Sequence, residues 1–180
     1  MASPYRIETS FAQGASVDGF RARRTQYSAA GDGPEAPQSV HRTLIVYLLD
    51  TNVISELRRT RPHPAVLDWI ENTDERVLFL AAITMAEIQA GIEITREQDD
   101  QKARELQAWA DMLMRTYAIL PMEGETFRLW ARMMHRKSPH LYEDAMIAAT
   151  ARLNGLTVVT RNVRDFKEFG IELMDPFVGR

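Results

Sequence analysis

The stretch LIVYLLDTNVISELRR, residues 44–59, decides how the chain is interpreted. An apolar run from Leu44 to Leu49 stops at Asp50, and a helical pattern over Asn52–Arg58 begins almost at once. A short, continuously apolar run is typical of a strand that is covered on both faces. We therefore predict a buried strand that leads directly into a helix. The carboxylate at the junction either caps the helix or forms one wall of an active site.

The rest of the chain repeats this alternation of apolar runs and helical periods. Strands are predicted at Leu44–Leu49, Val77–Ala82, Tyr117–Leu120, Leu156–Thr160 and Ile171–Met174. Helices are predicted at Asn52–Arg58, His63–Asn72, Thr84–Ile94, Gln98–Arg115, Gly124–Arg136 and Tyr142–Leu153. Such alternation indicates an α/β fold, with a mostly parallel sheet and helices on both of its faces. Ligands of these folds bind beyond the carboxyl ends of the strands.

Composition narrows the class of protein. The 180 residues are 45% hydrophobic and 26% charged, which suits one globular domain. Cysteine is absent, so a metal site would have to use oxygen or imidazole ligands. No apolar run approaches the ~20 residues that span a bilayer, and the N-terminus lacks the apolar segment of a secretory signal. We expect a cytoplasmic protein with no membrane partner.

The charge of the chain restricts how it would meet nucleic acid. The net charge is −3; residues 1–45 hold five Arg and four acidic residues, so residues 46–180 carry −4. Proteins held on nucleic acid by long-range attraction are normally basic. If this chain acts on nucleic acid, metal ions or local patches of Arg and Lys must offset the acidic surface.

Residues 1–42 differ in composition from the rest. They are rich in Ala, Ser, Gly, Pro and Arg and show no sustained periodicity. We predict a disordered or weakly ordered extension, followed by one domain over residues 43–180. The acidic residues Glu8, Asp18, Asp32 and Glu35 argue against a mitochondrial presequence. An upstream-extended translation start is the other explanation.

Acidic residues gather where the predicted strands end. Asp50 follows the first strand, and Glu87 lies one turn into the helix after the second. Asp144 lies in the first turn of the helix that leads to the fourth strand, and Asp165 follows that strand. In a doubly wound sheet these positions converge on one edge.

Each acid also has a purely structural interpretation. Asp50 and Asn52 are favourable residue types for beginning a helix. Glu87 is spaced from Thr84 as in a capping box. Taken singly, each of these residues is explained well by helix capping.

The later acids have a similar alternative. Asp144 and its neighbour Glu143 would interact favourably with the positive end of a helix dipole, which is worth ~0.3–1 kcal/mol. Asn162 could cap a short helix that carries Asp165 in its first turn. Capping and metal binding are compatible, because a carboxylate can hold a helix start when no metal is bound.

Taken together, the acids predict a metal site. Several carboxylates in one cleft repel one another and cannot all stay ionised without compensation. Mg²⁺ or Mn²⁺ supplies that compensation and prefers oxygen ligands. Such sites catalyse displacement at phosphorus, including hydrolysis of phosphodiesters.

Three separated motifs carry a family resemblance. They are LLDTNVISEL at 48–57, AAITMAEIQAGI at 81–92 and EDAMIAATARLNGLTVVTRNVRDF at 143–166. In this order and spacing they resemble the PIN-domain ribonucleases, and among them the VapC toxins of toxin–antitoxin pairs, especially the FitB-like branch. The resemblance runs from about Ile45 to Pro176.

The resemblance assigns roles to particular residues. The family's first three acidic positions are occupied by Asp50, Glu87 and Asp144. The fourth acid of the family stands either where this chain has Asn162 or where it has Asp165. By the same resemblance Thr160 is a hydroxyl residue that helps to arrange the site, and Asn52 stands beside its first acid.

The resemblance also implies an activity and partners. It implies a three-layer α/β/α sandwich that is usually dimeric and that acts as a Mg²⁺- or Mn²⁺-dependent endoribonuclease. The substrate would be RNA, often a tRNA or rRNA loop, and its cleavage would stop translation. The partner would be a VapB-like antitoxin that covers the active site and binds operator DNA.

Other polar and aromatic residues are interpreted as structural. The histidines at 41, 63, 135 and 140 lack the spacing of a zinc site. The tryptophans at 69, 109 and 130 occupy apolar helical positions, which favours the core or an interface. Arg132, Arg136 and Lys137 form either a solvated face or a phosphate-contacting lip beside the acidic cleft.

Two rival functions remain open. A phosphatase with Asp50 as nucleophile would commonly need a second aspartate two residues later, where this chain has Asn52, and a lysine near the metal. The lysines after the first strand are Lys102, Lys137 and Lys167, and none follows a strand. The other rival is a degenerate PIN domain that only binds protein or nucleic acid, because Asn162 is neutral.

Overall fold

A sheet of five parallel strands forms the centre of the molecule, in the order β3-β2-β1-β4-β5. The structure is a computed structural model and describes residues 45–178. The strands are β1 (Tyr47–Leu49), β2 (Leu78–Ala81), β3 (Ala118–Leu120), β4 (Thr157–Val159) and β5 (Leu173–Met174). All four pairs of neighbouring strands are parallel, which confirms the predicted sheet.

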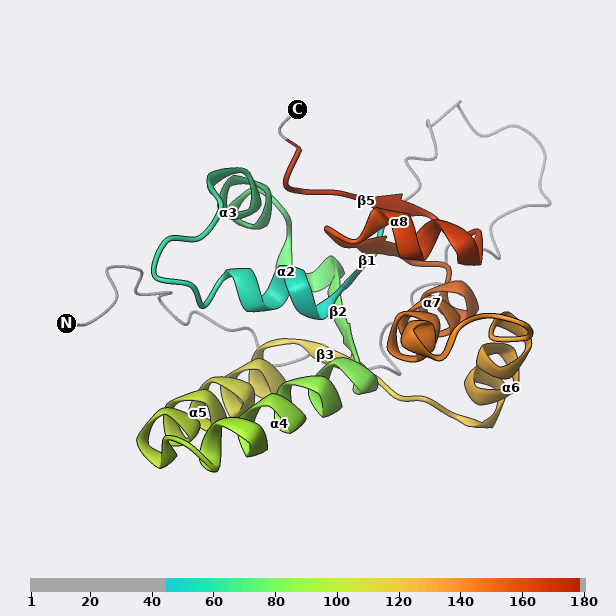
Figure 1. The fold of residues 1–180 in the computed structure, drawn as a ribbon. Coiled ribbons are helices and arrows are strands. Elements are labelled where there is room, and N and C mark those ends of the chain that lie inside the picture. Colours follow the sequence, from blue (N-terminus) through green and yellow to red (C-terminus); the bar gives the residue numbers. More distant parts are fainter. Residues whose placement is uncertain (1–44, 179–180) are drawn as a thin grey trace, which may run out of the picture.

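Helices cover both faces of this sheet. They are α2 (Thr51–Glu56), α3 (Pro64–Glu71), α4 (Ala82–Arg96), α5 (Asp100–Thr116), α6 (Gly124–Met133), α7 (Tyr142–Asn154) and α8 (Val163–Phe166). Short 3₁₀ helices lie at Glu75–Val77, Pro139–Leu141 and Lys167–Phe169. Figure 1 shows α2 to α5 on one side of the strands and α6 to α8 on the other. The predicted three-layer α/β/α sandwich is confirmed.

The alternation of side chains along the strands divides the core in two. Leu48 of β1 and Val158 of β4 pack with α6, α7 and α8. Their neighbours Leu49 and Val159 point to the opposite face and pack with α2 to α5. All four side chains are fully buried, and each contributes roughly 1.5–3 kcal/mol relative to an exposed position. Burial on both faces explains why the strands are continuously apolar in sequence.

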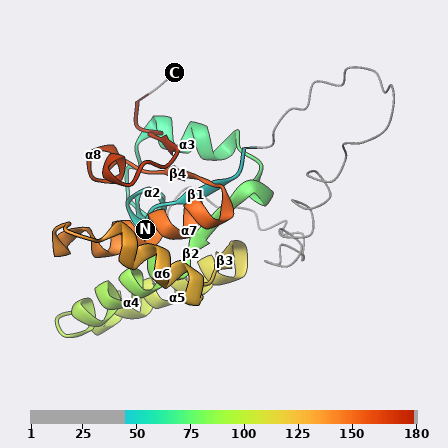
Figure 2. The same ribbon diagram turned by 90° about the vertical axis from the view of Figure 1, so that its right-hand side faces the viewer.

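The strand order places a switch point between β1 and β4. From β1 the chain moves outward through β2 to β3, and then returns through α6 and α7 to β4 on the other side of β1. α4 and α5 lie side by side in both views (Figures 1 and 2), as do α6 and α7 by their packing. A ligand of such a fold is expected at the carboxyl edge, where the two directions diverge.

The elements agree with the sequence prediction in type and order, and differ at their ends. The strands are shorter than predicted, and α4 begins at Ala82, two residues before its predicted start. Pro64 occupies the first turn of α3, where its fixed φ suits a helix start, and Gly155 ends α7 in the left-handed conformation with φ 59°. The predicted extension over residues 1–42 lies outside the described residues. Within residues 45–178, none of the helices has the length and apolarity to cross a bilayer.

Candidate active site

Asp50 stands at the carboxyl end of β1 and is 4% exposed. It begins α2, but its side chain makes no capping hydrogen bond to that helix. Its Oδ2 instead accepts hydrogen bonds from the Asn52 amide and from the Thr160 hydroxyl, the latter at 2.6 Å. The backbone N–H groups of Thr51 and Asn52 also act on this carboxylate, but its bond to Thr160 reaches beyond its own helix. The structure therefore points this buried acid towards the end of β4.

Thr160, which directly follows β4, connects two parts of the site. Its hydroxyl donates to Asp50 and accepts from the backbone N–H of Asn162 at 2.8 Å. Asn52 adds a second connection, because its amide oxygen accepts from the backbone N–H of Arg161 at 3.1 Å. The ends of the two central strands are thus joined by side chains. The family resemblance places Asn52 beside the first acid and gives Thr160 as a hydroxyl residue that helps to arrange the site.

Asn162 brings two further acids together. Its side-chain amide donates to Oδ2 of Asp165 at 3.0 Å and to Oδ2 of Asp144 at 3.3 Å. It also occupies the start of α8, but its side chain makes no capping hydrogen bond. Asp165 lies in the first turn of α8 and Asp144 in the first turn of α7, as predicted. One neutral side chain therefore holds both acids through the same donor group.

Glu87 reaches the site from α4. Its Oε2 accepts a hydrogen bond of 2.6 Å from the hydroxyl of Thr51, the residue after Asp50. The predicted capping box is wrong: β2 runs into α4 without a loop, so Thr84 lies inside the helix and Ala81 caps it. The Thr84 hydroxyl is fully buried and has no hydrogen-bond partner among the described residues. Glu87 is therefore directed at α2 and not at its own helix start.

Burial and neighbouring negative charges raise the pKa of Asp144. Burial is the largest cause for Asp144, and the neighbouring charges of Asp50, Asp165, Glu87 and Glu143 add to it, so that the pKa of Asp144 rises to about 7. These four neighbouring carboxylates are thus close enough to Asp144 to repel its charge.

The other two shifted acids follow the same pattern. Burial also raises the pKa of Asp50, against the opposing effect of the hydrogen bond from Thr160. For Glu87, burial raises the pKa, the Thr51 hydrogen bond lowers it, and the charges of Asp50 and Glu143 raise it further. Glu143 itself is exposed, at the outer side of the cluster.

The donor set of this cluster fits a hard divalent cation. It offers carboxylate oxygens from three helices and one strand end, with hydroxyl and amide groups between them. In residues 45–178 no three His, Asp or Glu side chains already form a compact ligand set. The carboxylates are hydrogen-bonded to Thr51, Thr160 and Asn162 instead. A cation would have to replace some of these hydrogen bonds, and the charge it brings would relieve the repulsion.

Sequence reasoning missed two polar residues near this edge. Thr51 orients Glu87, and its place between Asp50 and Asn52 was the available signal. Glu56, at the end of α2, is 6% exposed and accepts a hydrogen bond from the backbone N–H of His63 at 3.0 Å. Its partners lie in the loop that follows α2, and the sequence pattern alone does not predict that this loop folds back onto Glu56.

The three tryptophans pack on the core, as predicted. Trp69 and Trp109 pack on the core cluster beside α2 to α5, and Trp130 packs on the other cluster. His63 begins α3, and His140 contacts the Ser138 hydroxyl. His41 lies outside the described residues.

Comparison with known proteins identifies the family. The sequence model described as the PIN domain matches residues 47–172 of this chain. The chain belongs to the PIN-domain family. It is 35% identical over 136 residues to the plasmid stability protein StbB of Pseudomonas syringae pv. tomato, which covers 72% of this chain and 97% of that protein. It is 33% identical over 141 residues to the VapC ribonuclease Y4jK of Sinorhizobium fredii, covering 72% and 96%. The chain therefore belongs with the VapC and FitB toxins, as its motifs predicted.

A solved PIN-domain structure agrees with this assignment. The crystal structure of FitAcB from Neisseria gonorrhoeae contains a chain that is 29% identical to this one. The two folds superpose with a TM-score of 0.66, over 73% of this chain and 99% of that chain. The FitB toxin of the same organism is 30% identical over 135 residues.

Proposed function

We propose that this PIN domain is the toxin of a toxin–antitoxin pair and a metal-dependent endoribonuclease. The observation that carries the proposal is the convergence of Asp50, Glu87, Asp144 and Asp165 at one edge of the sheet, where burial and repulsion bring the pKa of Asp144 to about 7. Proteins rarely keep such a cluster without a cation to balance it. Relatives named as ribonucleases support RNA as the substrate.

Each polar residue has a defined task in this proposal. The four acids hold Mg²⁺ or Mn²⁺, and Asn162 positions Asp144 relative to Asp165. Thr160 and Asn52 fix the carboxylate of Asp50, while Thr51 fixes that of Glu87. Bound divalent ions in such sites lower the pKa of water and neutralise charge that develops on phosphoryl oxygens, which is what phosphodiester hydrolysis needs.

The proposed partner is an antitoxin of the VapB or FitA type, and we expect a homodimer of the toxin in the complex. Structurally similar chains occur in the crystal structures of FitAcB and of FitAB bound to an IR36 DNA fragment. By analogy, the antitoxin would cover the acidic site and bring the complex to operator DNA. Cleavage of RNA by the free toxin would inhibit translation in the cytoplasm.

Cleavage of total RNA by the purified protein tests this function. The native chain is compared with Asp50→Asn in Mg²⁺, in Mn²⁺ and in EDTA. Asp111→Asn is the control, because it removes an exposed acid of α5 that lies outside the cluster. We expect cleavage by the native chain and the control that requires metal and that disappears in Asp50→Asn. Equal cleavage by all three proteins, or cleavage that persists in EDTA, would overturn the mechanism.

Absence of cleavage by the native chain under every condition would favour the other candidate, a non-catalytic PIN domain. The neutral Asn162 at the centre of the cluster is the feature that speaks for that candidate. A titration of Mn²⁺ into the same protein would then separate a cluster that binds metal without cleaving from one that binds none.

A further inference from the structure

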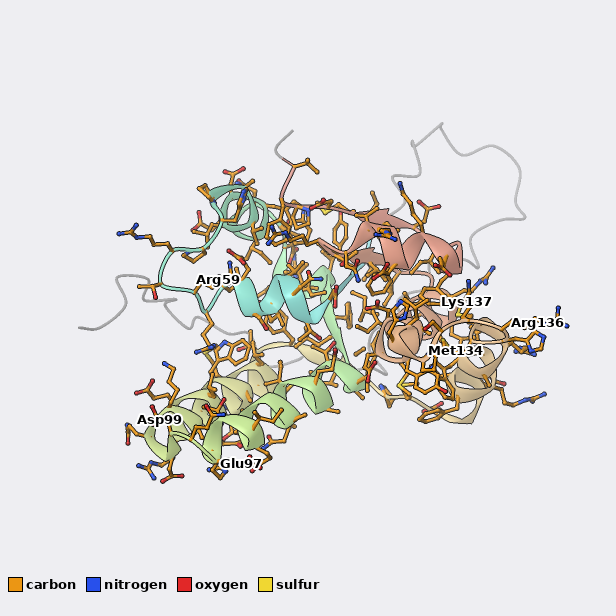
Figure 3. The ribbon with its side chains drawn as sticks, in the orientation of Figure 1. Arg59, Glu97, Asp99, Met134, Arg136 and Lys137 are labelled. Carbon is orange, nitrogen blue, oxygen red and sulfur yellow. The ribbon has the colours of Figure 1, made fainter. Side chains whose placement is uncertain are left out.

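A nuclease with a net negative charge needs local cations to hold a polyanionic substrate. In the structure, the available cations lie in a different place from the one predicted from the sequence. The basic group that we predicted beside the cleft is partly neutralised, because Lys137 pairs with Glu168 at 2.7 Å and lies over the Phe169 ring. Figure 3 shows Arg136 and Lys137 on one side of the molecule and Arg59 on the other, at the end of α2. The basic residues around Arg59 were not predicted as a site.

Four cations surround one pocket at the far end of α2. It is a shallow depression, largely open to solvent, and is lined by Arg58, Arg59, Thr60, Arg61 and Lys102; we call it the basic pocket. The first four residues form the loop after α2, and Lys102 lies in the first turn of α5. No acidic residue lines it. In a chain of net charge −3, this concentration of positive charge is a specific feature.

The loop that carries the arginines is held in place by a buried acid. Glu56 accepts from the backbone N–H of His63 and pairs with Arg59 at 3.3 Å, so it ties both ends of the loop together. Arg58 is held from the other side, because its guanidinium lies 5.6 Å from the centre of the Trp109 ring of α5. The basic pocket is therefore a built feature, in which tertiary contacts fix the arginine-bearing loop.

Part of this positive charge is available to a ligand. Lys102 pairs with Glu105 at 3.0 Å, and Arg59 with Glu56. Arg58 and Arg61, in contrast, form no ion pair with another residue in the described range 45–178. The nearby acid Asp100 is engaged by Arg96 and Arg104. Among the described residues, no acid therefore competes with an anion for the guanidinium groups of Arg58 and Arg61.

The position of the basic pocket relates it to the acidic cluster. Asp50 begins α2, and the arginine loop follows the last residue of that helix. Six helical residues span about 9 Å, so α2 separates the two sites by a distance that a short stretch of single-stranded RNA covers. Trp109 packs on the core and lies under the Arg58 guanidinium, so its part here is to hold that arginine beside the path of the strand.

We propose that the basic pocket binds the phosphate backbone of the RNA substrate, so that the strand runs along α2 from the arginine loop to the acidic cluster. This inference rests on the proposed ribonuclease function and adds to it the residues that hold the substrate. Guanidinium groups suit this task, because they donate two parallel hydrogen bonds to one phosphate.

Binding of a fluorescein-labelled oligouridylate, measured by anisotropy in EDTA, tests the proposal without any cleavage. The variant Arg58→Gln/Arg61→Gln is compared with the native chain over a range of salt concentrations. The matched control is Arg115→Gln/Arg152→Gln, which removes two exposed arginines from the last turns of α5 and α7, at the opposite edge of the sheet. All three proteins are checked for equal melting temperatures.

We expect the pocket variant to bind on the order of tenfold more weakly at low salt, and the slope of log K against log salt to fall by about 0.7 for each phosphate that the variant no longer neutralises. The control should match the native chain. Equal binding and equal slopes for the pocket variant, or no binding by the native chain at low salt, would overturn the proposal. Binding of a polyglutamate peptide that depends on the two arginines, with oligouridylate unaffected, would make the pocket a protein-docking site instead. None of these three results decides the proposed function, whose test is metal-dependent cleavage.

Discussion

The hydroxyl of Thr160 donates a hydrogen bond of 2.6 Å to Oδ2 of Asp50, across the carboxyl ends of the two central strands. Both side chains are buried, at 0% and 4% exposure. The bond joins strands on the two sides of the topological switch point, so the fold and the site depend on the same contact. It also opposes the rise in the pKa of Asp50 that burial causes.

Thr160→Val should therefore weaken both stability and activity. The variant keeps the shape of the side chain but leaves a buried carboxylate with one donor fewer, which costs roughly 1–3 kcal/mol. Loss of a residue that orients a metal-binding carboxylate lowers activity by roughly 10–100-fold. Urea unfolding and the rate of RNA cleavage measure the two effects. Thr150→Val is the control, because its buried hydroxyl bonds only to Met146 O within α7; a loss of activity as large in the control would contradict this role of Thr160.

The raised pKa of Asp144 predicts how stability depends on pH. Between pH ~4 and ~7 the folded state keeps a proton on this carboxyl that the unfolded chain has lost, so stability is greatest below that range and falls as pH rises through it. In EDTA, the melting temperature of the native chain should fall between about pH 4 and pH 7, and that of Asp144→Asn should fall less. Asp144→Asn should also abolish cleavage. Parallel melting profiles for the native chain, Asp144→Asn and the control Asp111→Asn would show that the acids do not strain the fold.

Asn162→Asp should make the metal-free protein less stable and more responsive to metal. The substitution replaces the amide donor shared by Asp144 and Asp165 with another acid, which adds repulsion to the cluster. In EDTA we expect a lower melting temperature than in the native chain, and on adding Mg²⁺ a larger increase. Asn162→Ala separates the two causes, since it removes the donor without adding charge. If Mg²⁺ raises the melting temperatures of all three proteins equally, Asn162 is not part of the metal site.

Thr51→Val tests the contact that orients Glu87. Its loss should raise the pKa of Glu87 further, because the Thr51 hydrogen bond is the effect that lowers it. Because Thr51 is half-buried at the first position of α2, we expect little change in stability and a fall in cleavage of roughly 10–100-fold. Steady-state cleavage against Mg²⁺ concentration should show a higher metal requirement. An unchanged metal requirement would mean that Glu87 is positioned by other contacts.

The sequence predicted those parts of the candidate site that follow from the order of strands and helices along the chain. Asp50 and Asp144 follow from the order of strands and helices, because the carboxyl ends of parallel strands share one edge. Glu87 was placed correctly but for the wrong contact, since β2 continues into α4 without the loop that a capping box requires. That Asn162 binds both Asp144 and Asp165 depends on how α7 and α8 pack, which local pattern does not encode.

The basic pocket was even less predictable, because it depends on contacts between elements that are distant in the sequence. Its three arginines lie within four consecutive residues, but Lys102 comes from α5, and Trp109 holds Arg58 from the same helix. The buried Glu56 that closes the loop has the sequence pattern of an ordinary polar residue at a helix end. Only the packing of α2 against the α4–α5 pair turns a run of arginines into a pocket.

Direct measurement of Mn²⁺ binding tests the central claim, that the acids at the end of β1, in α4, in α7 and in α8 hold a divalent cation. Electron paramagnetic resonance of free Mn²⁺, titrated with the metal-free protein, reports binding independently of any RNA. The native chain and Asp111→Asn should deplete the free-ion signal equally, and Asp50→Asn and Asp144→Asn should do so far less. Equal depletion by all four proteins, or depletion by none of them, would contradict the account.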